Sequence, residues 1–242
     1  MDLVLGTLIL RPYVFAFVAC FLVAGVFDLG WRRTLVFAGW VWPLVWAAEF
    51  ASTRVGVPFG LYHYTGTTRG RELYVIDAPI IDSLSFTFLA YAAFCLARGV
   101  LGNRARAWPL AATGGVLMML LDIVIDPIAV LGDRWFLGRI FYYPDGGAYF
   151  GVPLSNFVGW ALIGTAAIGG YLALTGNGRG ARPEFGIALY YAVLAFNLAV
   201  TAWILEWVLL GLGLLLHAAT AAALYAVRRR PAIGPGMESK KA

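Results

Sequence analysis

The chain contains few charged residues. Only 13% of its 242 residues are Asp, Glu, Lys or Arg, whereas 61% are hydrophobic. A soluble domain has about 25% charged and about 45–50% apolar residues, so the composition excludes an ordinary soluble enzyme and a disordered chain. The excess of hydrophobic side chains has to face lipid, and the sequence therefore predicts an integral membrane protein.

Cysteine and histidine are also scarce, with two residues of each. Cys20 and Cys95 lie inside apolar runs and are interpreted as small core residues, which excludes a disulfide scaffold. His63 and His217 are too few for a histidine-based metal centre. The sequence has no GxGxxG, Walker A, HExxH or GxSxG motif. We therefore expect neither a metal nor a cofactor. The net charge of +5 comes without a nucleic-acid-binding motif, so nucleic acid is not an expected partner.

The apolar runs predict about seven membrane-spanning helices, since one span needs about 20 apolar residues. Five such runs cover residues 12–29, 34–53, 79–97, 108–131 and 152–174. The stretch 184–227 is too long for one span at about 1.5 Å per residue, so we expect two spans that turn near 201–211. The prediction is one all-α transmembrane domain over 1–230 and a short disordered cytoplasmic tail over 231–242. No basic segment precedes the first apolar run, so we expect no cleaved signal peptide.

The distribution of basic residues predicts the orientation of the bundle. Most arginines and lysines follow the spans that end near residues 29, 97 and 174, or lie in the tail. The positive-inside rule then places the C-terminus in the cytoplasm, and we expect a multi-pass protein of the plasma membrane. Two irregular or re-entrant connections, over 54–78 and 132–151, would lie together on the non-cytoplasmic side.

Several carboxylates lie within the apolar runs. They are Glu49, Asp82, Asp122, Asp126 and Glu206. Each costs about 2.5–3.5 kcal/mol at the centre of a spanning helix, so such groups face the bundle interior and commonly have a function. Asp122 and Asp126 are four residues apart and share one helix face. Two carboxylates so close do not both ionise easily, so one of them is expected to stay protonated and act as a proton donor.

Structural interpretations of the same acids remain open. Glu49 would pair with Arg54, and Asp126, which precedes Pro127, would end or cap a helix. Glu206 and Asp28 lie near predicted span ends or turns, and a structural role is the preferred interpretation for both.

Aromatic residues are frequent near the acids. An interfacial belt explains many of them, but they also predict a groove for a long conjugated ligand, and aromatic faces stabilise a carbocation. Asn156 either joins helices by hydrogen bonds or orients a water or an acid. The candidate substrate-binding residues are Trp46, Phe59, Tyr62, Tyr64, Phe86, Phe150, Asn156 and Trp160. Asp77, Arg54 and His63 are supporting candidates in or beside the first irregular stretch.

Three segments resemble one known family in the same order along the chain. They are EFASTRVGVPFGLYHY at 49–64, LDIVIDP at 121–127 and YFGVPLSNFVGW at 149–160. They are similar to the membrane hydratases of carotenoid biosynthesis that act on γ-carotene-type or bisanhydrobacterioruberin-type ends. The resemblance covers roughly residues 40–165. It implies cofactor-free addition of water to a terminal isoprenoid double bond, which gives a tertiary alcohol.

The residues fit that chemistry. A buried acid would protonate the alkene, aromatic faces would stabilise the tertiary cation, and a carboxylate would take a proton from the attacking water. The candidate catalytic residues are Asp126, Asp122, Asp82 and Glu49, with the acid and the base unassigned. The expected partners are a carotenoid or another long isoprenoid, membrane lipid, and other carotenoid enzymes.

Two other functions remain open. In a magnesium-dependent intramembrane prenyltransferase, Asp122 and Asp126 would hold the metal against a diphosphate. In a proton-coupled transporter of a lipophilic solute, the buried acids would relay protons.

Overall fold

The computed structural model describes residues 2–176 and 178–229. Seven helices in these residues are long and apolar enough to cross a membrane. They are α2 (Pro12–Leu29), α3 (Trp31–Val55), α4 (Ile80–Leu101), α5 (Ala107–Val130), α6 (Leu154–Leu174), α7 (Glu184–Trp203) and α8 (Trp207–Arg229). This confirms the all-α membrane fold and the turn between the last two spans. The tail predicted over 231–242 lies outside the described residues.

Proline and glycine set several helix ends. A short helix, α1 (Leu3–Leu10), precedes α2, and α2 begins at Pro12, where a missing N–H costs nothing. Helix α3 ends at Val55, and the next residue, Gly56, has a φ of +74°, in the left-handed region that glycine adopts readily. The N–H of Gly56 donates to the carbonyl oxygen of Ser52 over 3.0 Å. Local sequence therefore decides where α3 stops and where the first irregular stretch begins.

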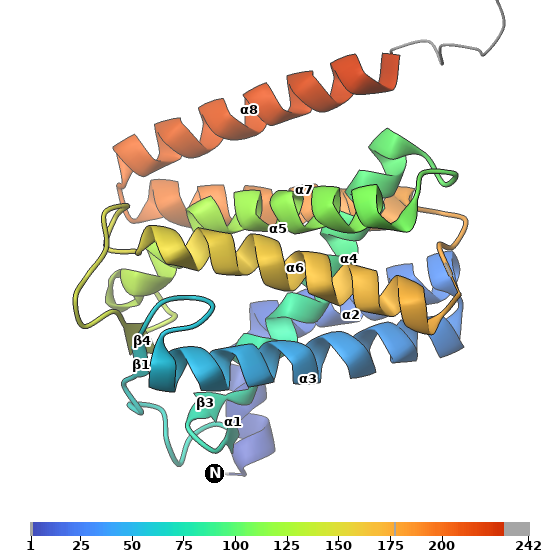
Figure 1. Ribbon diagram of the computed structural model, residues 1–242. Coiled ribbons are helices and arrows are strands. Elements are labelled where there is room, and N and C mark those ends of the chain that lie inside the picture. Colours follow the sequence, from blue (N-terminus) through green and yellow to red (C-terminus); the bar gives the residue numbers. More distant parts are fainter. Residues whose placement is uncertain (1, 177, 230–242) are drawn as a thin grey trace, which may run out of the picture.

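Helix α4 lies at the centre of the bundle and is buried along most of its length. It crosses the other helices obliquely (Figure 1) and contacts α2, α3, α5 and α7. Helix α8 lies at the outside of the bundle beside α7 (Figure 1), and most of its surface is exposed. Helices α5 and α6 pack through small residues, since a Cβ added to Gly164 would lie 2.9 Å from the Cα of Gly115.

The two irregular stretches meet at one end of the bundle. Strand β1 (His63–Tyr64) pairs antiparallel with β4 (Phe141–Tyr142), and β2 (Tyr74–Val75) pairs with β3 (Ala78–Pro79). A 3₁₀ turn, η1 (Gly132–Arg134), follows α5. The prediction that both stretches lie on one side of the bundle is therefore confirmed. We call this side the loop end (left in Figure 1).

A buried ion pair fastens the loop end. The guanidinium of Arg11, between α1 and α2, lies 3.3 Å from the carboxylate of Glu72 and 2.9 Å from the carbonyl oxygen of Leu137. Arg11 thus joins the start of the bundle to both irregular stretches. Both side chains of the ion pair are almost fully buried, so loss of either one would leave the other as an uncompensated buried charge.

Two further acids have the structural roles expected of them. Asp28 forms a fully buried ion pair with Arg98 over 2.6 Å at the end of the bundle opposite the loops. It also accepts a hydrogen bond from the backbone N–H of Arg182 over 2.7 Å, which fixes the connection before α7. Glu206 pairs with Arg134 and ties the turn between α7 and α8 to η1.

Candidate active site

A cavity lies inside the bundle near the loop end, with about 130 Å³ of space for the centres of water-sized molecules. Its walls come from α2 to α7 and from both irregular stretches. Most of the lining is aromatic or aliphatic, and the polar groups are few and concentrated. Such a site, concave and apolar with a small number of placed polar groups, is typical of a small-molecule binding site.

The first polar group joins α5 to α6. The side-chain nitrogen of Asn156 lies 2.7 Å from Oδ2 of Asp122 and 2.7 Å from Oδ2 of Asp126. The hydroxyl of Tyr143 lies 3.4 Å from the same oxygen of Asp126. Asp126 lines the cavity, whereas Asp122 is fully buried and its Oδ1 has no hydrogen-bond partner in the described residues. Helix α5 continues through Pro127 to Val130, so Asp126 does not end the helix.

The second polar group comes from α3, α4 and the first irregular stretch. Glu49 is 3% exposed, and its Oε2 has no hydrogen-bond partner in the described part of the chain. Asp82, in the first turn of α4, lines the same cavity. The hydroxyls of Tyr62 and Tyr64 lie 3.4 Å apart beside these acids. Arg54 pairs with Asp77 over 3.0 Å, so the expected pair of Arg54 with Glu49 is not formed.

Three tyrosines of the irregular stretches stay protonated. Burial, reinforced by the charges of Glu49 and Asp82, raises the pKa of Tyr62 and of Tyr64 well above the usual value. Burial, with Asp126 as the next cause, also raises the pKa of Tyr143. At neutral pH all three are neutral phenols that can donate a hydrogen bond to a carboxylate or a water.

An aromatic wall stands beside the acids. The rings of Phe86 and Trp160 stack with centroids 4.1 Å apart, and the ring of Phe59 lies 5.8 Å from that of Phe86. Tyr62 makes an edge contact with Tyr143 at 5.9 Å. Ring faces in such a wall can stabilise a positive charge that forms next to them.

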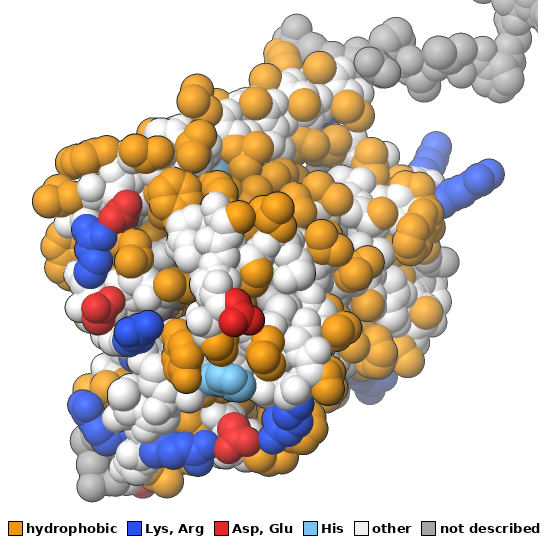
Figure 2. Space-filling model, turned by 60° about the vertical axis from the view of Figure 1, so that its left-hand side comes forward, with side chains coloured by type: hydrophobic (Ala, Val, Ile, Leu, Met, Phe, Trp, Pro, Cys, Tyr) orange, Lys and Arg blue, Asp and Glu red, His pale blue; other side chains and the backbone are white. Residues whose placement is uncertain are grey.

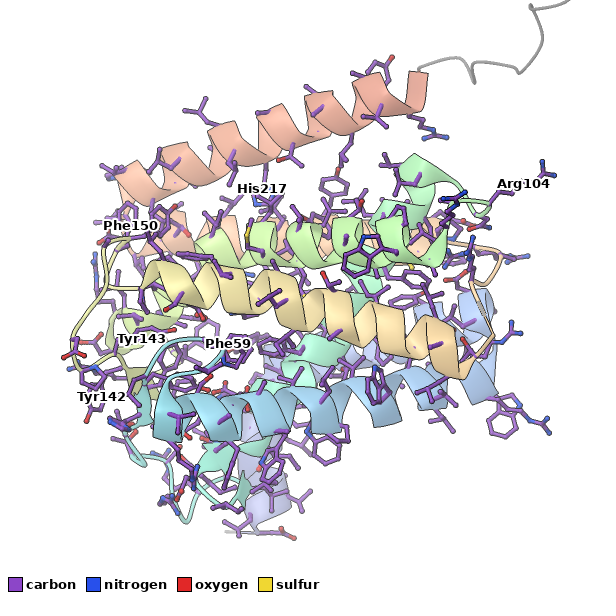
Figure 3. All side chains as sticks on the ribbon, viewed as in Figure 1. Phe59, Arg104, Tyr142, Tyr143, Phe150 and His217 are labelled. Carbon is purple, nitrogen blue, oxygen red and sulfur yellow. The ribbon has the colours of Figure 1, made fainter. Side chains whose placement is uncertain are left out.

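Most of the predicted site residues meet at this cavity. The residues that line it are Glu49, Phe59, Tyr62, Tyr64, Asp82, Phe86, Asp126, Asn156 and Trp160. Asp122 is not among the lining residues, and it contacts Asn156, which is one of them. Figure 3 places Phe59 and Tyr143 toward the interior of the loop end.

Five predicted residues lie elsewhere. Trp46, Arg54 and Asp77 line a separate small cavity next to Glu49. Phe150 has a φ of +49° and packs on Tyr149 near the turn between α7 and α8, outside the cavity lining (Figure 3). His63 is exposed, with its ring 6.0 Å from that of Tyr142.

Several aromatic residues of the cavity were not among the predicted site residues, and Tyr143, Tyr13, Phe17 and Phe196 are four of them. Tyr143, in the second irregular stretch, contacts Asp126 of α5. No regular spacing in the sequence predicts this contact between a loop residue and a helix residue. Tyr13 and Phe17 of α2 contact Phe196 of α7, with ring centroids 5.1 Å and 5.7 Å apart. These residues resemble ordinary core aromatics of spanning helices, so only their position identifies them.

The arrangement suits proton transfer better than the binding of a cation. The amide of Asn156 directs its N–H groups at both Asp122 and Asp126. A magnesium ion between the two aspartates would need oxygen atoms in that position instead. In the described ranges, no group of three His, Cys, Asp or Glu residues is placed to hold a metal ion.

Comparison with known proteins gives one informative relative. The chain is 32% identical over 148 residues to a bisanhydrobacterioruberin hydratase of Haloarcula japonica. The match covers 61% of this chain and 47% of that protein, so the chain spans about half the length of the relative it matches. No solved structure matches the chain.

The family comparison covers most of the sequence. A family model described as "Carotenoid biosynthesis protein" matches residues 4–220, which include helices α2 to α7, both irregular stretches and more than half of α8. The chain therefore belongs to the carotenoid biosynthesis protein family.

Proposed function

We propose that the protein is a cofactor-independent carotenoid hydratase. It adds water across a terminal isoprenoid double bond and forms a tertiary alcohol. The observation that carries the proposal is the placement of two pairs of carboxylates at one apolar, aromatic cavity. The pairs are Asp122 with Asp126, and Glu49 with Asp82. The similarity to a bisanhydrobacterioruberin hydratase supports the same reaction class.

Asp126 is the proposed general acid. It lines the cavity, and its contact with the same amide of Asn156 keeps it close to Asp122, where repulsion between two carboxylates favours one retained proton. Transfer of that proton to the CH carbon of the terminal double bond leaves a cation on the carbon that carries two methyl groups. The π electrons of the alkene form the new C–H bond, and the electron pair of the former O–H bond stays on Asp126.

The aromatic wall stabilises the intermediate. Phe86, Trp160 and Phe59 present ring faces or edges to the cavity beside the acids. Cation–π attraction is worth about 2 kcal/mol or more in a site without water. The rest of the polyene extends past Phe17 and Phe196, where the cavity reaches α2 and α7.

Glu49 is the proposed base, assisted by Asp82 and the phenols of Tyr62 and Tyr64. A water oxygen attacks the tertiary cation and loses a proton to Glu49, which gives the neutral alcohol. Return of that proton to Asp126 completes the cycle. Asp126 and Glu49 thus act on the two carbons of one double bond, and no redox partner is needed.

The substrate and product are lipid-soluble, so they enter and leave from the bilayer, and contact with other carotenoid enzymes would shorten their path.

We place the protein in the plasma membrane with its C-terminus in the cytoplasm. Fusion of a green fluorescent protein after residue 242 should give a fluorescent product. Alkaline phosphatase inserted at Gly70, in the first irregular stretch, should be active. The opposite pattern would reverse the orientation.

The decisive test is expression in a host that makes acyclic or monocyclic carotenoids, followed by mass spectrometry of the pigments. The wild-type chain should add one water, and a reaction in deuterated water should place one deuterium on carbon. Asp126→Asn should lower the rate by roughly 10²–10⁴-fold. Asp145→Asn, an exposed aspartate of the second stretch, is the matched control and should hydrate at the wild-type rate.

A chelator separates hydration from the magnesium-dependent alternative. Purified protein washed with EDTA should keep its hydration rate, because the proposed steps use only carboxylates and water. Loss of activity that magnesium restores, or an unchanged pigment set with folded wild-type protein, would overturn the proposal.

A further inference from the structure

A second, smaller cavity lies next to the acids. It has about 10 Å³ of space for the centres of water molecules, and it is separate from the large cavity. Glu49 and Tyr64 line both cavities, so these two side chains form the wall between them. The other residues that line the small cavity are Trp46, Phe50, Thr53, Arg54, Val75, Asp77 and Ala78.

The outer end of the small cavity is charged and exposed. Arg54 and Asp77 form an ion pair over 3.0 Å, and their side chains are 39% and 54% exposed. Arg69 also binds Asp77, over 2.8 Å. Figure 2 shows charged side chains gathered at the loop end, while hydrophobic side chains dominate the rest of the visible surface. The small cavity therefore leads toward the aqueous side of the molecule.

The inner end of the small cavity holds an unsatisfied acceptor. Oε2 of Glu49 is buried and has no hydrogen-bond partner in the described residues. Buried polar atoms are normally satisfied by protein or by water. About 10–15 Å³ of space for the centre of a water molecule is needed to hold one water, so the small cavity has room for about one water next to Glu49. Water in the small cavity would give Glu49 its missing donor.

We propose that the small cavity is the inlet for the water that the reaction consumes. Water passes the Arg54–Asp77 pair and reaches Glu49, while the carotenoid occupies the large cavity from the lipid side. The inference rests on the proposed function. At the shared wall, the oxygen of one water bonds to the tertiary cation and the carboxylate of Glu49 accepts its proton. Separate routes keep the aromatic wall dry, which preserves the cation until the delivered water attacks.

Thiol labelling tests the inlet without any use of the catalytic activity. In a Cys20→Ser background, Thr53→Cys should react with a small cationic methanethiosulfonate, because that reagent modifies hydrated thiolates. Ala47→Cys lies on the same helix at an exposed, lipid-facing position and is the matched control. We expect Thr53→Cys to react roughly tenfold faster than Ala47→Cys. Equal rates in folded protein would overturn the inlet.

Filling the small cavity tests its role in hydration. Thr53→Phe and Val75→Phe, from two walls of the small cavity, should each lower kcat at least several-fold. The KM for the carotenoid should change little, because the large cavity is intact. Ala47→Phe should have the wild-type kcat. Wild-type kcat in both filled variants would overturn the inlet and leave the proposed function standing. If the wild type does not hydrate carotenoids but the Thr53→Cys thiol still reacts with the methanethiosulfonate, the proposed function is overturned. The conclusion that the small cavity holds water would then still stand.

Discussion

The side-chain nitrogen of Asn156 lies 2.7 Å from a carboxylate oxygen of Asp126. The same nitrogen is equally close to Asp122, so one amide from α6 holds two acids of α5 at a fixed separation. Under the proposed function, Asn156 is a positioning residue for the proton that the two aspartates would share.

Removal of this amide should slow the chemistry more than it weakens binding. Asn156→Ala is expected to lower kcat by roughly 10²-fold, because the acid is no longer held toward the alkene. KM should stay within a small factor, since the apolar contacts with the carotenoid remain. Steady-state hydration in detergent or liposomes measures both constants. Ser155→Ala, at the neighbouring exposed position, should behave as wild type. A rise in KM with kcat unchanged would contradict the positioning role.

The contact between α5 and α6 depends on glycine. A Cβ at Gly164 would lie 2.9 Å from the Cα of Gly115 and 3.1 Å from the sulfur of Met118, so Gly164→Val should force the helices apart. Overpacking of this kind costs about 1–3 kcal/mol. We expect a lower melting temperature and, because Asn156 and the aspartates lie on these two helices, a lower hydration rate. In Gly169→Ala the new Cβ would meet only Ala111, at 3.6 Å, so this control should keep the wild-type melting temperature.

The buried ion pair at the loop end should dominate local stability. Glu72→Gln leaves the guanidinium of Arg11 buried without a counter-charge, which costs about 3–5 kcal/mol. The exposed pair of Arg69 with Asp77 offers the comparison, because Arg69→Gln should cost at most about 1 kcal/mol. Thermal unfolding of both variants in the same detergent gives the difference. Similar melting temperatures would show that the burial of Arg11 is not maintained in solution.

The buried tyrosines predict destabilisation at alkaline pH. The pKa of Tyr143 is raised in the folded protein, so its neutral form is favoured by folding. Once the pH exceeds about 10, the unfolded chain loses this proton while the folded chain keeps it, and the free energy of unfolding falls. Tyr143→Phe should therefore show a smaller loss of melting temperature between neutral pH and pH values above about 10 than the wild type. An identical pH dependence in the two proteins would contradict the burial of this phenol.

The spans and the candidate acids can be recognised in the sequence because both are set by composition. Long apolar runs have to be helical in lipid, since every backbone polar group must be satisfied within the segment. The length of the stretch 184–227 predicted two spans with a turn near 201–211, and the turn lies at 204–206. Glu49, Asp82 and Asp126 are conspicuous because an acid in such a run is costly. The chemistry of each residue and its cost in lipid are properties of the local sequence.

Partners between distant segments were decided only by tertiary packing. Glu49 and Arg54 are near neighbours in sequence, yet Arg54 binds Asp77 and leaves Glu49 between two cavities. Asp122 and Asp126 share a helix face, yet only Asp126 lines the cavity, because α6 covers Asp122 and brings Asn156 against both. Spacing along one helix fixes which face a residue occupies. What covers that face depends on how α5, α6 and the loop end pack together.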